Sequence, residues 1–145
     1  MIRRTRSERG AISAMLVTLI VMLFVLAGLV VDGGFAINAR QKIYDDAEQA
    51  ARAAANQIDI ETLRATGEIV ILEGQARQKA QEYMSARGYP PSQVQVSVDD
   101  VAGEVTVAAR DTVNTTLLQL IFISDFDVEG QATSRPAVGI TGEMP

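Results

Sequence analysis

An uncharged apolar stretch runs from Ala11 to Val31, directly after a basic segment that holds four arginines. A helix rises about 1.5 Å per residue, so a helix over this stretch measures roughly 30 Å, the hydrocarbon thickness of a bilayer. The stretch therefore predicts a transmembrane helix over residues 11–31. Because arginine-rich segments stay in the cytoplasm, residues 1–10 are predicted as a cytoplasmic leader and the rest as exported. The four arginines are Arg3, Arg4, Arg6 and Arg9.

The sequence contains no Cys, no His and no Trp, and these absences exclude several function classes. Nucleophile systems of the Ser-His-Asp and Cys-His types cannot be built, nor can a zinc site of the usual Cys and His ligands. We therefore expect no enzyme, no catalytic residue, no metal site and no cofactor. Without Cys, the exported part has to fold by packing alone.

The charge balance bears on the partners. Four of the 13 basic residues and one of the 18 acidic residues precede the apolar stretch, which leaves the remainder with nine basic and 17 acidic side chains, a net charge of −8. Nucleic acid needs a basic surface, so we expect no nucleic-acid partner. Residues 32–145 are enough for one small domain and not for two.

Residues 32–58 predict a helix that continues from the span and carries a narrow stripe of small side chains. Alanine in the stripe lets another helix or a sheet approach closely. The surface that covers it is either the chain's own head or another subunit. The stripe residues, spaced three and four apart, are Tyr44, Ala47, Ala51, Ala54 and Ile58.

Four residues stand where the chain is predicted to leave the membrane. Gly33 and Gly34 each weaken a helix by about 1 kcal/mol relative to Ala, and so permit a bend at the membrane surface. Asp32 closes the span, and Arg40 lies slightly over two turns later, near the same face of the helix. We predict these four as helix-packing and exit residues, with interfacial anchoring as the alternative for the two charged ones.

Shorter elements follow and predict a small α+β head over residues 59–135, before a flexible tail over 136–145. Apolar residues alternate with polar ones over 94–98 and again over 105–109, which predicts an antiparallel hairpin with Gly103 in its loop. The other expected elements are a helical turn over 59–64 ending at Gly67, a helix over 73–87, a helical turn or core-facing connector over 117–123 and a third strand over 126–133.

Several short motifs follow one another in the first 57 residues. Residues 7–14 read SERGAISA, residues 31–34 read VDGG, residues 40–41 read RQ and residues 46–54 read DAEQAARAA. In order and spacing they resemble the RGA…VDxG…R…ADAAALA pattern of TadE/TadG-like proteins, the pseudopilin-like components of tight-adherence (Flp) pilus assembly systems. The resemblance covers residues 7–57, while the head matches only loosely.

The resemblance implies a pilin-like layout, in which a long N-terminal helix, membrane-spanning in its first half, carries the head. It implies a single-pass protein of a bacterial cytoplasmic membrane that acts through helix packing and protein contacts. Its partners would be other pilus-assembly or pilin subunits, prepilin peptidase and membrane lipid. The alternative is a single-pass envelope protein with an exported binding domain unrelated to pili.

The resemblance also implies a cleavage site. Prepilin peptidases cut after a Gly between the basic residues and the apolar helix, which here is the bond between Gly10 and Ala11. The fifth residue after the cut is usually Glu in this family, but it is Met15 in this chain. An uncut anchor of the TadG-like kind is therefore the alternative to a processed TadE-like subunit. Signal-peptidase cleavage at Gly34-Phe35-Ala36, which would release the head, is a further alternative.

Three further patterns have ordinary structural explanations. Residues 125–130 have oxygen-bearing side chains at alternate positions and Gly at the sixth, as in the first half of a calcium-binding loop. Pro136, however, stands at the twelfth position, where such a loop needs Glu. Carboxylates gather at Asp99, Asp100 and Glu104, which are predicted as solvated groups of a hairpin turn. Asn114-Thr115-Thr116 fits a glycosylation sequon.

Overall fold

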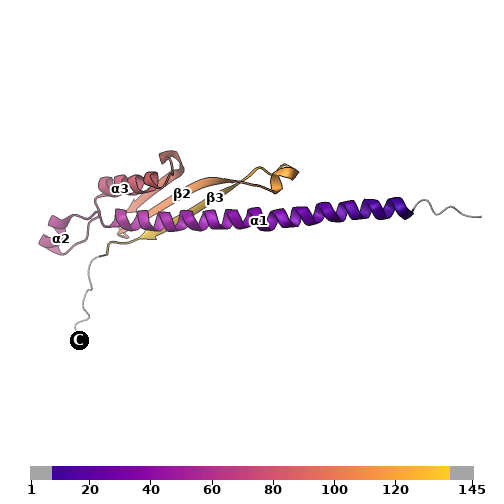
Figure 1. The fold of residues 1–145 in the computed structure, drawn as a ribbon. Helices are drawn as coiled ribbons and strands as arrows, with labels where there is room; N and C mark the ends of the chain where they lie inside the picture. The colour runs from indigo at the N-terminus through magenta and orange to yellow at the C-terminus, as the bar shows by residue number, and fades with distance from the viewer. Residues whose placement is uncertain (1–7, 138–145) are drawn as a thin grey trace, which may run out of the picture. The chain divides into compact units, whose positions relative to one another are not determined.

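The computed structural model describes residues 8–137, which form an α+β fold (Figure 1). The predicted fold class is confirmed: a long N-terminal helix precedes a small head with helix and antiparallel sheet. Residues 1–7 of the predicted leader and 138–145 of the predicted tail lie outside the described part. The elements are α1 (Glu8–Ala55), α2 (Ile60–Thr66), α3 (Glu73–Ala86), the 3₁₀ turn η1 (Pro91–Gln93), β1 (Val94–Asp99), β2 (Glu104–Asn114), the 3₁₀ turn η2 (Leu118–Ile121) and β3 (Asp125–Ser134).

The described residues form two compact units. The first unit combines residues 8–37 of α1 with residues 113–126, which lead from the end of β2 through η2 into β3. The second unit combines residues 38–112 with residues 127–137, and so holds the rest of α1, the helices α2 and α3, and most of the sheet.

The second unit is built on a three-stranded sheet in the order β1-β2-β3. β1 pairs antiparallel with β2, with Val94 opposite Ala109 and Asp99 opposite Glu104, so the predicted hairpin is confirmed. Gly103 in its loop has φ 63°, a conformation that glycine adopts without steric cost. Alternation puts the apolar side chains of the strands on one face. The buried ones are Val94, Val105, Val107, Ala109, Val128 and Ala132.

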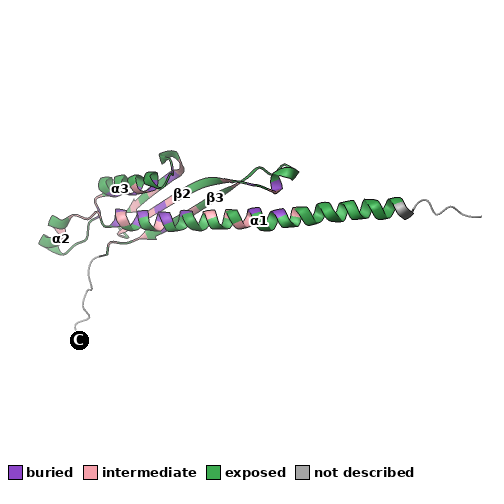
Figure 2. Cartoon of the chain, in the orientation of Figure 1, coloured by how far each residue is buried: buried purple, intermediate pink, exposed green. Residues whose placement is uncertain are grey.

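The helices of the second unit supply the other side of this core. α3 contacts β1 and buries Ala76, Ala80 and Met84, which stand four residues apart on one face. α1 buries a broader stripe, seen as purple bands along its second part in Figure 2. The apolar members of that stripe are Ile43, Ala47, Ala50, Ala51, Ala54 and Ala55.

α1 departs from the sequence prediction at two points. It runs through Gly33 and Gly34 as uninterrupted helix, so the bend that these residues permit is not used. It also ends at Ala55, whereas the prediction extended the helix to residue 58. The reason is an isolated antiparallel bridge between Ile58 and Ile71, because pairing with a distant segment requires extended backbone at Ile58.

The short helix α2 is defined by its two ends, as predicted. Asp59 caps its first turn by accepting hydrogen bonds from the backbone N–H and the hydroxyl of Thr62 and from the backbone N–H of Glu61, and these bonds hold the pKa of Asp59 below its ordinary 3.8. Gly67 ends the helix with φ 78°. Thus the turn at 59–67 is a self-contained element, fixed by local hydrogen bonds.

The apolar run 117–123 is a helical turn, as predicted, but it does not face the core. Only Leu118 of η2 is buried, while Leu120 is 72% and Phe122 96% exposed. Four residues of η2 are too few to present a second buried face, so the remaining apolar side chains of the run point outward.

Candidate functional site

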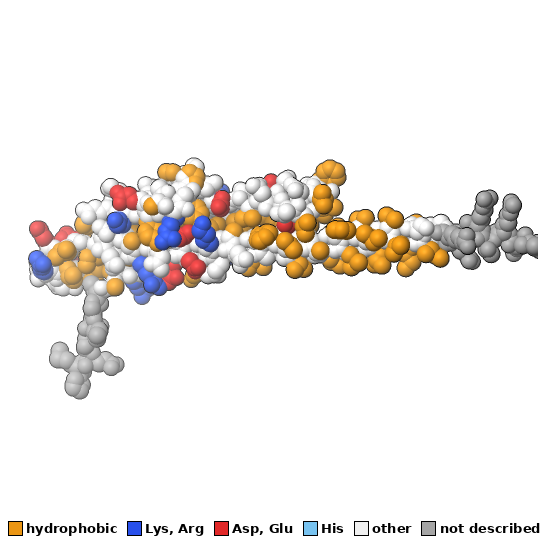
Figure 3. Space-filling view, viewed as in Figure 1, with side chains coloured by type: hydrophobic (Ala, Val, Ile, Leu, Met, Phe, Trp, Pro, Cys, Tyr) orange, Lys and Arg blue, Asp and Glu red, His pale blue; other side chains and the backbone are white. Residues whose placement is uncertain are grey.

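The first part of α1 has a large apolar surface that the rest of the described chain leaves mostly uncovered. Most large side chains from Ile12 to Val31 are exposed, up to 74% at Met15 and 75% at Val30. Figure 3 shows this surface as an unbroken run of hydrophobic side chains, whereas the charged side chains gather over the second unit. α1 is the one helix of the described chain that is long and apolar enough to cross a membrane. An uncovered apolar surface of this size marks contact with lipid or with other helices.

Asp32 lies directly after this apolar stretch and is buried, with 1% of its surface exposed. Its Oδ1 accepts a hydrogen bond of 2.9 Å from the backbone N–H of Thr116, and its Oδ2 accepts bonds of 2.9 Å from Leu117 and 2.7 Å from Leu118. The donors are the first residue of η2 and the two residues before it, whose N–H groups a helix leaves without partners. The carboxylate therefore ties the segment between β2 and β3 to α1.

Further bonds close that segment, residues 115–124, which we name the tip loop. The backbone N–H of Thr115 donates to the carbonyl of Ser124 at 2.9 Å, and its hydroxyl donates to the carbonyl of Ile123. The backbone N–H of Ile123 donates to the carbonyl of Leu118 at 3.2 Å. The tip loop is consequently a closed, internally bonded turn that Asp32 holds at its base.

Gly28, one helical turn before Asp32, leaves room for the tip loop. A Cβ on Gly28 would lie 2.9 Å from Cδ2 of Leu118 and 3.2 Å from Cβ of Leu117, closer than side-chain carbons normally pack. The missing side chain thus lets Leu118 rest on the helix, where Asp32 can reach the loop backbone.

We expect replacement of Asp32 by alanine to free the tip loop. Three backbone N–H groups would lose an ionised acceptor, and amide exchange at Thr116, Leu117 and Leu118 should accelerate by about tenfold or more, measured by hydrogen exchange and mass spectrometry. Asp32→Asn keeps one acceptor oxygen and should give an intermediate effect. Asp45→Asn, at an exposed position of the same helix, is the control. Unchanged amide exchange in Asp32→Ala would contradict the hydrogen bonding of the tip loop to Asp32.

The alanine stripe of α1 lies in the second unit and is covered there by the chain's own residues. Ala47, Ala51 and Ala54 have no exposed surface. Of the two surfaces that the sequence left open, own head or another subunit, the single chain therefore supplies the cover. The predicted membership of Tyr44 is wrong, since it is 45% exposed and the neighbouring Ile43 is buried instead.

Gly130 of β3 meets α1 at this stripe. A Cβ on Gly130 would lie 2.9 Å from the backbone nitrogen of Tyr44 and 3.1 Å from Cγ2 of Ile43. Strand and helix thus approach so closely that only glycine fits between them.

A second buried aspartate, Asp46, faces α3 and the chain after it. Its Oδ2 accepts a hydrogen bond of 3.2 Å from the hydroxyl of Tyr89, and its Oδ1 pairs with the guanidinium of Arg87 at 3.2 Å. Arg87 also donates to the hydroxyl of Tyr83 at 2.8 Å and stacks over its ring. Asp46 belongs to the DAEQAARAA motif, and sequence reasoning did not single it out because its partners lie about 40 residues away.

The hydroxyl of Tyr89 provides a pH-dependent test of this cluster. Burial, followed by the negative charge and the hydrogen bond of Asp46, raises the pKa of Tyr89 from 10.0 to about 12. Since the folded pKa is the higher one, the protonated hydroxyl stabilises the fold below pH 10, and this contribution is lost as the pH rises through about 12.

We expect the absorbance at 295 nm of wild type minus Tyr89→Phe to titrate near pH 12. The Asp46→Asn substitution should lower this midpoint, because the charge is removed, yet leave it above 10.0, because burial persists. A difference titration with its midpoint at pH 10.0 would mean that the hydroxyl of Tyr89 is not buried beside Asp46.

The other predicted exit residues lie apart from these contacts. Gly33 and Gly34 are half-buried, with open space where a Cβ would stand. Arg40 is exposed and lines a polar hollow of about 320 Å³ in the second unit, together with Arg110 and Glu129. Although Asp32 and Arg40 share a helix, their surroundings therefore differ.

The weaker patterns have local explanations. Residues 125–130 belong to β3 and are extended, so they do not form a calcium loop. Asp99 accepts hydrogen bonds from the backbone of Val101 and Ala102 within the hairpin turn, and Glu104 pairs with Arg135 at 2.6 Å. In the described part of the chain, no three acidic side chains gather as a metal site would require. Asn114, the sequon residue, is the exposed last residue of β2.

The predicted cleavage residues lie at the beginning of α1. Gly10 and Ala11 are helical and exposed, and a Cβ on Gly10 would meet no other atom within 4 Å. Nothing in the described part of the chain therefore covers the bond between them.

The family comparison concerns the same part of the chain. Residues 10–57 match the family described as "Putative Flp pilus-assembly TadE/G-like", and this match extends from the beginning of α1 to two residues beyond its end. Comparisons with curated proteins and with solved structures gave no significant match. The predicted resemblance is thus confirmed over α1: residues 10–57 are similar to the TadE/G-like family of Flp pilus assembly.

Proposed function

We propose that this chain is a membrane-anchored, pseudopilin-like component of an Flp pilus assembly system, which acts through helix packing and protein contacts. The observation that carries the proposal is the match of residues 10–57, because the matched segment coincides with α1, which has both an uncovered apolar part and a packed part. The uncovered part offers a surface to the apolar helices of other pilus subunits, and the packed part carries the head.

The orientation that we propose has residues 1–10 in the cytoplasm and the head outside the cytoplasmic membrane. The four leading arginines support it, since basic segments are retained on the cytoplasmic side. The net charge of −8 on the remainder is compatible with export and gives nucleic acid no basic surface.

Deletion of the gene in cells that carry a complete Flp system tests the proposal. We expect loss of pili, counted by electron microscopy, and recovery with the wild-type chain. A variant with arginine at Leu23 should fail to restore them, whereas Val101→Arg, with the same charge on the exposed hairpin loop, should succeed. Normal pili in the deletion strain would contradict a role in assembly and favour the alternative, an envelope protein with an unrelated partner.

The subtype depends on processing at the bond between Gly10 and Ala11. We propose to decide it from the N-terminal residue and the intact mass of the protein purified from such membranes. A chain that begins at Ala11 would be a processed TadE-like subunit, even though Met15 stands at the usual Glu position. An intact leader would indicate a permanent anchor of the TadG-like kind, and a chain that begins after Ala36 would contradict membrane anchoring.

A further inference from the structure

We propose that the tip loop is a second membrane-contacting element, which inserts its apolar turn among the acyl chains of the outer leaflet beside α1. This inference rests on the proposed function in one respect, since it requires α1 to span the membrane. It assigns a role to residues that the family match, which ends at residue 57, does not include.

The tip loop is apolar and turned outward. No charged residue lies between Asp111 and Asp125, and the side chains of Leu120 and Phe122 are among the most exposed apolar ones of the described chain. Phe122 also has φ 68°, a conformation that costs a residue with a side chain free energy. In water, a strained and almost fully exposed phenylalanine has no compensating contact, whereas acyl chains would supply one.

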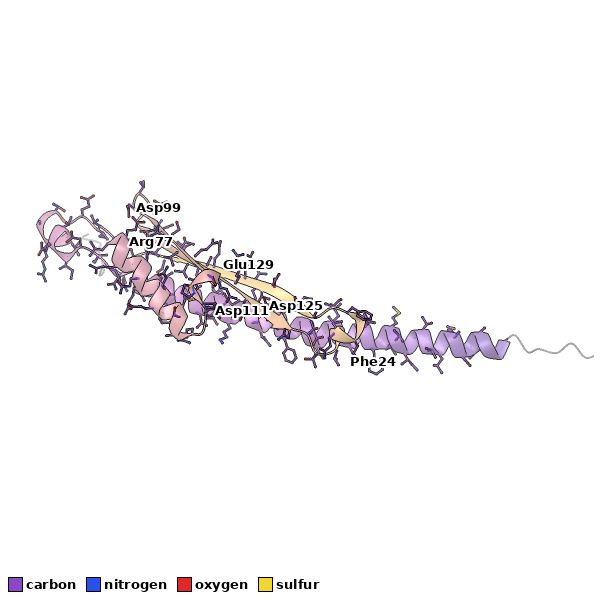
Figure 4. The ribbon with its side chains drawn as sticks, turned by 90° about the horizontal axis from the view of Figure 1, so that it is seen from above. Phe24, Arg77, Asp99, Asp111, Asp125 and Glu129 are labelled. Carbon is purple, nitrogen blue, oxygen red and sulfur yellow. The ribbon has the colours of Figure 1, made fainter. Side chains whose placement is uncertain are left out.

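The position of the tip loop along α1 sets its depth. Leu117, Leu120 and Ile121 line a small apolar hollow of about 230 Å³ with Val21, Phe24 and Val25 of α1. Figure 4 labels Phe24 on the helix surface and Asp125 where β3 begins. The three α1 residues precede Asp32 by seven to eleven positions, or roughly 10–16 Å of helix. If residues 11–31 span the bilayer, the turn of the tip loop is therefore within the outer leaflet.

A loop can enter that layer only if its backbone polar groups have partners inside the protein. The tip loop meets this condition at the positions described above, where Asp32 accepts three N–H groups and residues 115 and 123 are bonded within the loop. The N–H groups of Leu120 and Phe122 donate to the carbonyls of Leu117 and Gln119. Asp32 thus removes both its own charge and three backbone donors from contact with lipid.

Continuity with the span favours lipid as the occupant. Because Asp32 is buried, the exposed apolar surface of α1 continues past it to Phe35, which is 51% exposed, and Ile37, which is 71% exposed. The first exposed charge on α1 after the apolar stretch is Arg40. The outward side chains of the tip loop extend this surface sideways, so that helix and loop together form one lipid-facing body.

The test uses single cysteines, because the natural chain has none. The full chain is labelled with an environment-sensitive fluorophore at Phe122→Cys, at Leu120→Cys as a second loop position, at Leu23→Cys in the span and at Val101→Cys in the exposed hairpin loop. Each protein is reconstituted, at high lipid excess, in phosphatidylethanolamine and phosphatidylglycerol vesicles that contain nitroxide-labelled acyl chains. Iodide in the buffer is the water-phase quencher.

We expect both loop labels to lose most of their emission to the acyl-chain nitroxide, like the label at Leu23, while the Val101 label responds only to iodide. Loop labels that respond only to iodide, with Leu23 quenched by lipid, would overturn the inference and leave the anchor intact. Loop labels shielded from both quenchers would indicate that the chain itself or a second copy covers the tip loop, and would also overturn the inference. A Leu23 label that responds like Val101 would overturn the anchor and the inference together.

Discussion

Replacing Leu23 by arginine is expected to remove the chain from the membrane. Leu23 stands in the middle of residues 11–31 and is 56% exposed on α1, so the guanidinium would face hydrocarbon. Insertion scales put the cost of an arginine at the centre of a transmembrane helix at about 2.5–3.5 kcal/mol, which lowers the equilibrium constant for insertion roughly 100-fold relative to a neutral residue. Alkaline extraction of membranes, with detection of the chain in the pellet and the supernatant, measures the effect.

Two variants test whether loss of the Leu23 side chain, or an added positive charge elsewhere in the chain, could by itself release the protein from the membrane. Leu23→Ala removes the same side chain without adding a charge and should stay in the membrane. Val101→Arg adds the same charge at the exposed hairpin loop and should also stay. If the Leu23→Arg protein is fully embedded with its head outside, residues 11–31 do not form the span.

Substitution of Gly130 by valine is expected to give the largest loss of stability in the head. Its Cβ would overlap the backbone nitrogen of Tyr44 at 2.9 Å, and a backbone atom in the middle of a long helix cannot move aside as a flexible side chain can. Overpacking of this kind costs about 1–3 kcal/mol. The near-ultraviolet circular dichroism of the buried Tyr89, followed through a urea titration of the full chain in detergent, reports the unfolding of the head.

The matched control is Gln131→Val, at the next residue of β3, which is exposed. Valine favours strands, so this variant should unfold at the same urea concentration as wild type or a slightly higher one. An equal urea midpoint for Gly130→Val and wild type would mean that β3 does not approach α1 as closely as the structure has it.

The pattern of apolar residues predicted those helices and strands that are held together by contacts between residues close in the sequence. The hairpin followed from alternation over 94–98 and 105–109, and α2 from the helical turn over 59–64 that ends at Gly67, because each of these signals lies within a short segment of the chain, residues 94–109 and 59–67. The small alanines of α1 likewise predicted close packing, although the stripe was assigned one position away at Tyr44. A stripe dominated by Ala gives little contrast between adjacent positions on a helix.

The contacts that define the candidate site could not be predicted in this way. Asp32 stood out in the sequence as a charge at the end of an apolar stretch, which suggested a helix-packing and exit residue or an interfacial anchor. Its partners at residues 116–118 lie more than 80 positions away and are backbone N–H groups, which every residue except proline carries. The sequence therefore holds no side-chain signal for this pairing. The outward orientation of Leu120 and Phe122 was missed for a related reason, since apolar runs ordinarily face a core.

Site-specific photocrosslinking from the apolar part of α1 tests whether this surface packs against other pilus subunits. A photoreactive amino acid replaces Leu19, which is 48% exposed, in cells that carry the complete Flp system, with a second probe at the exposed Gln78 of α3 for comparison. Mass spectrometry identifies what each probe captures. We expect the Leu19 probe to capture pilin or pilus-assembly subunits through their apolar helices. Capture of lipid alone, or of proteins outside the pilus system, would contradict it.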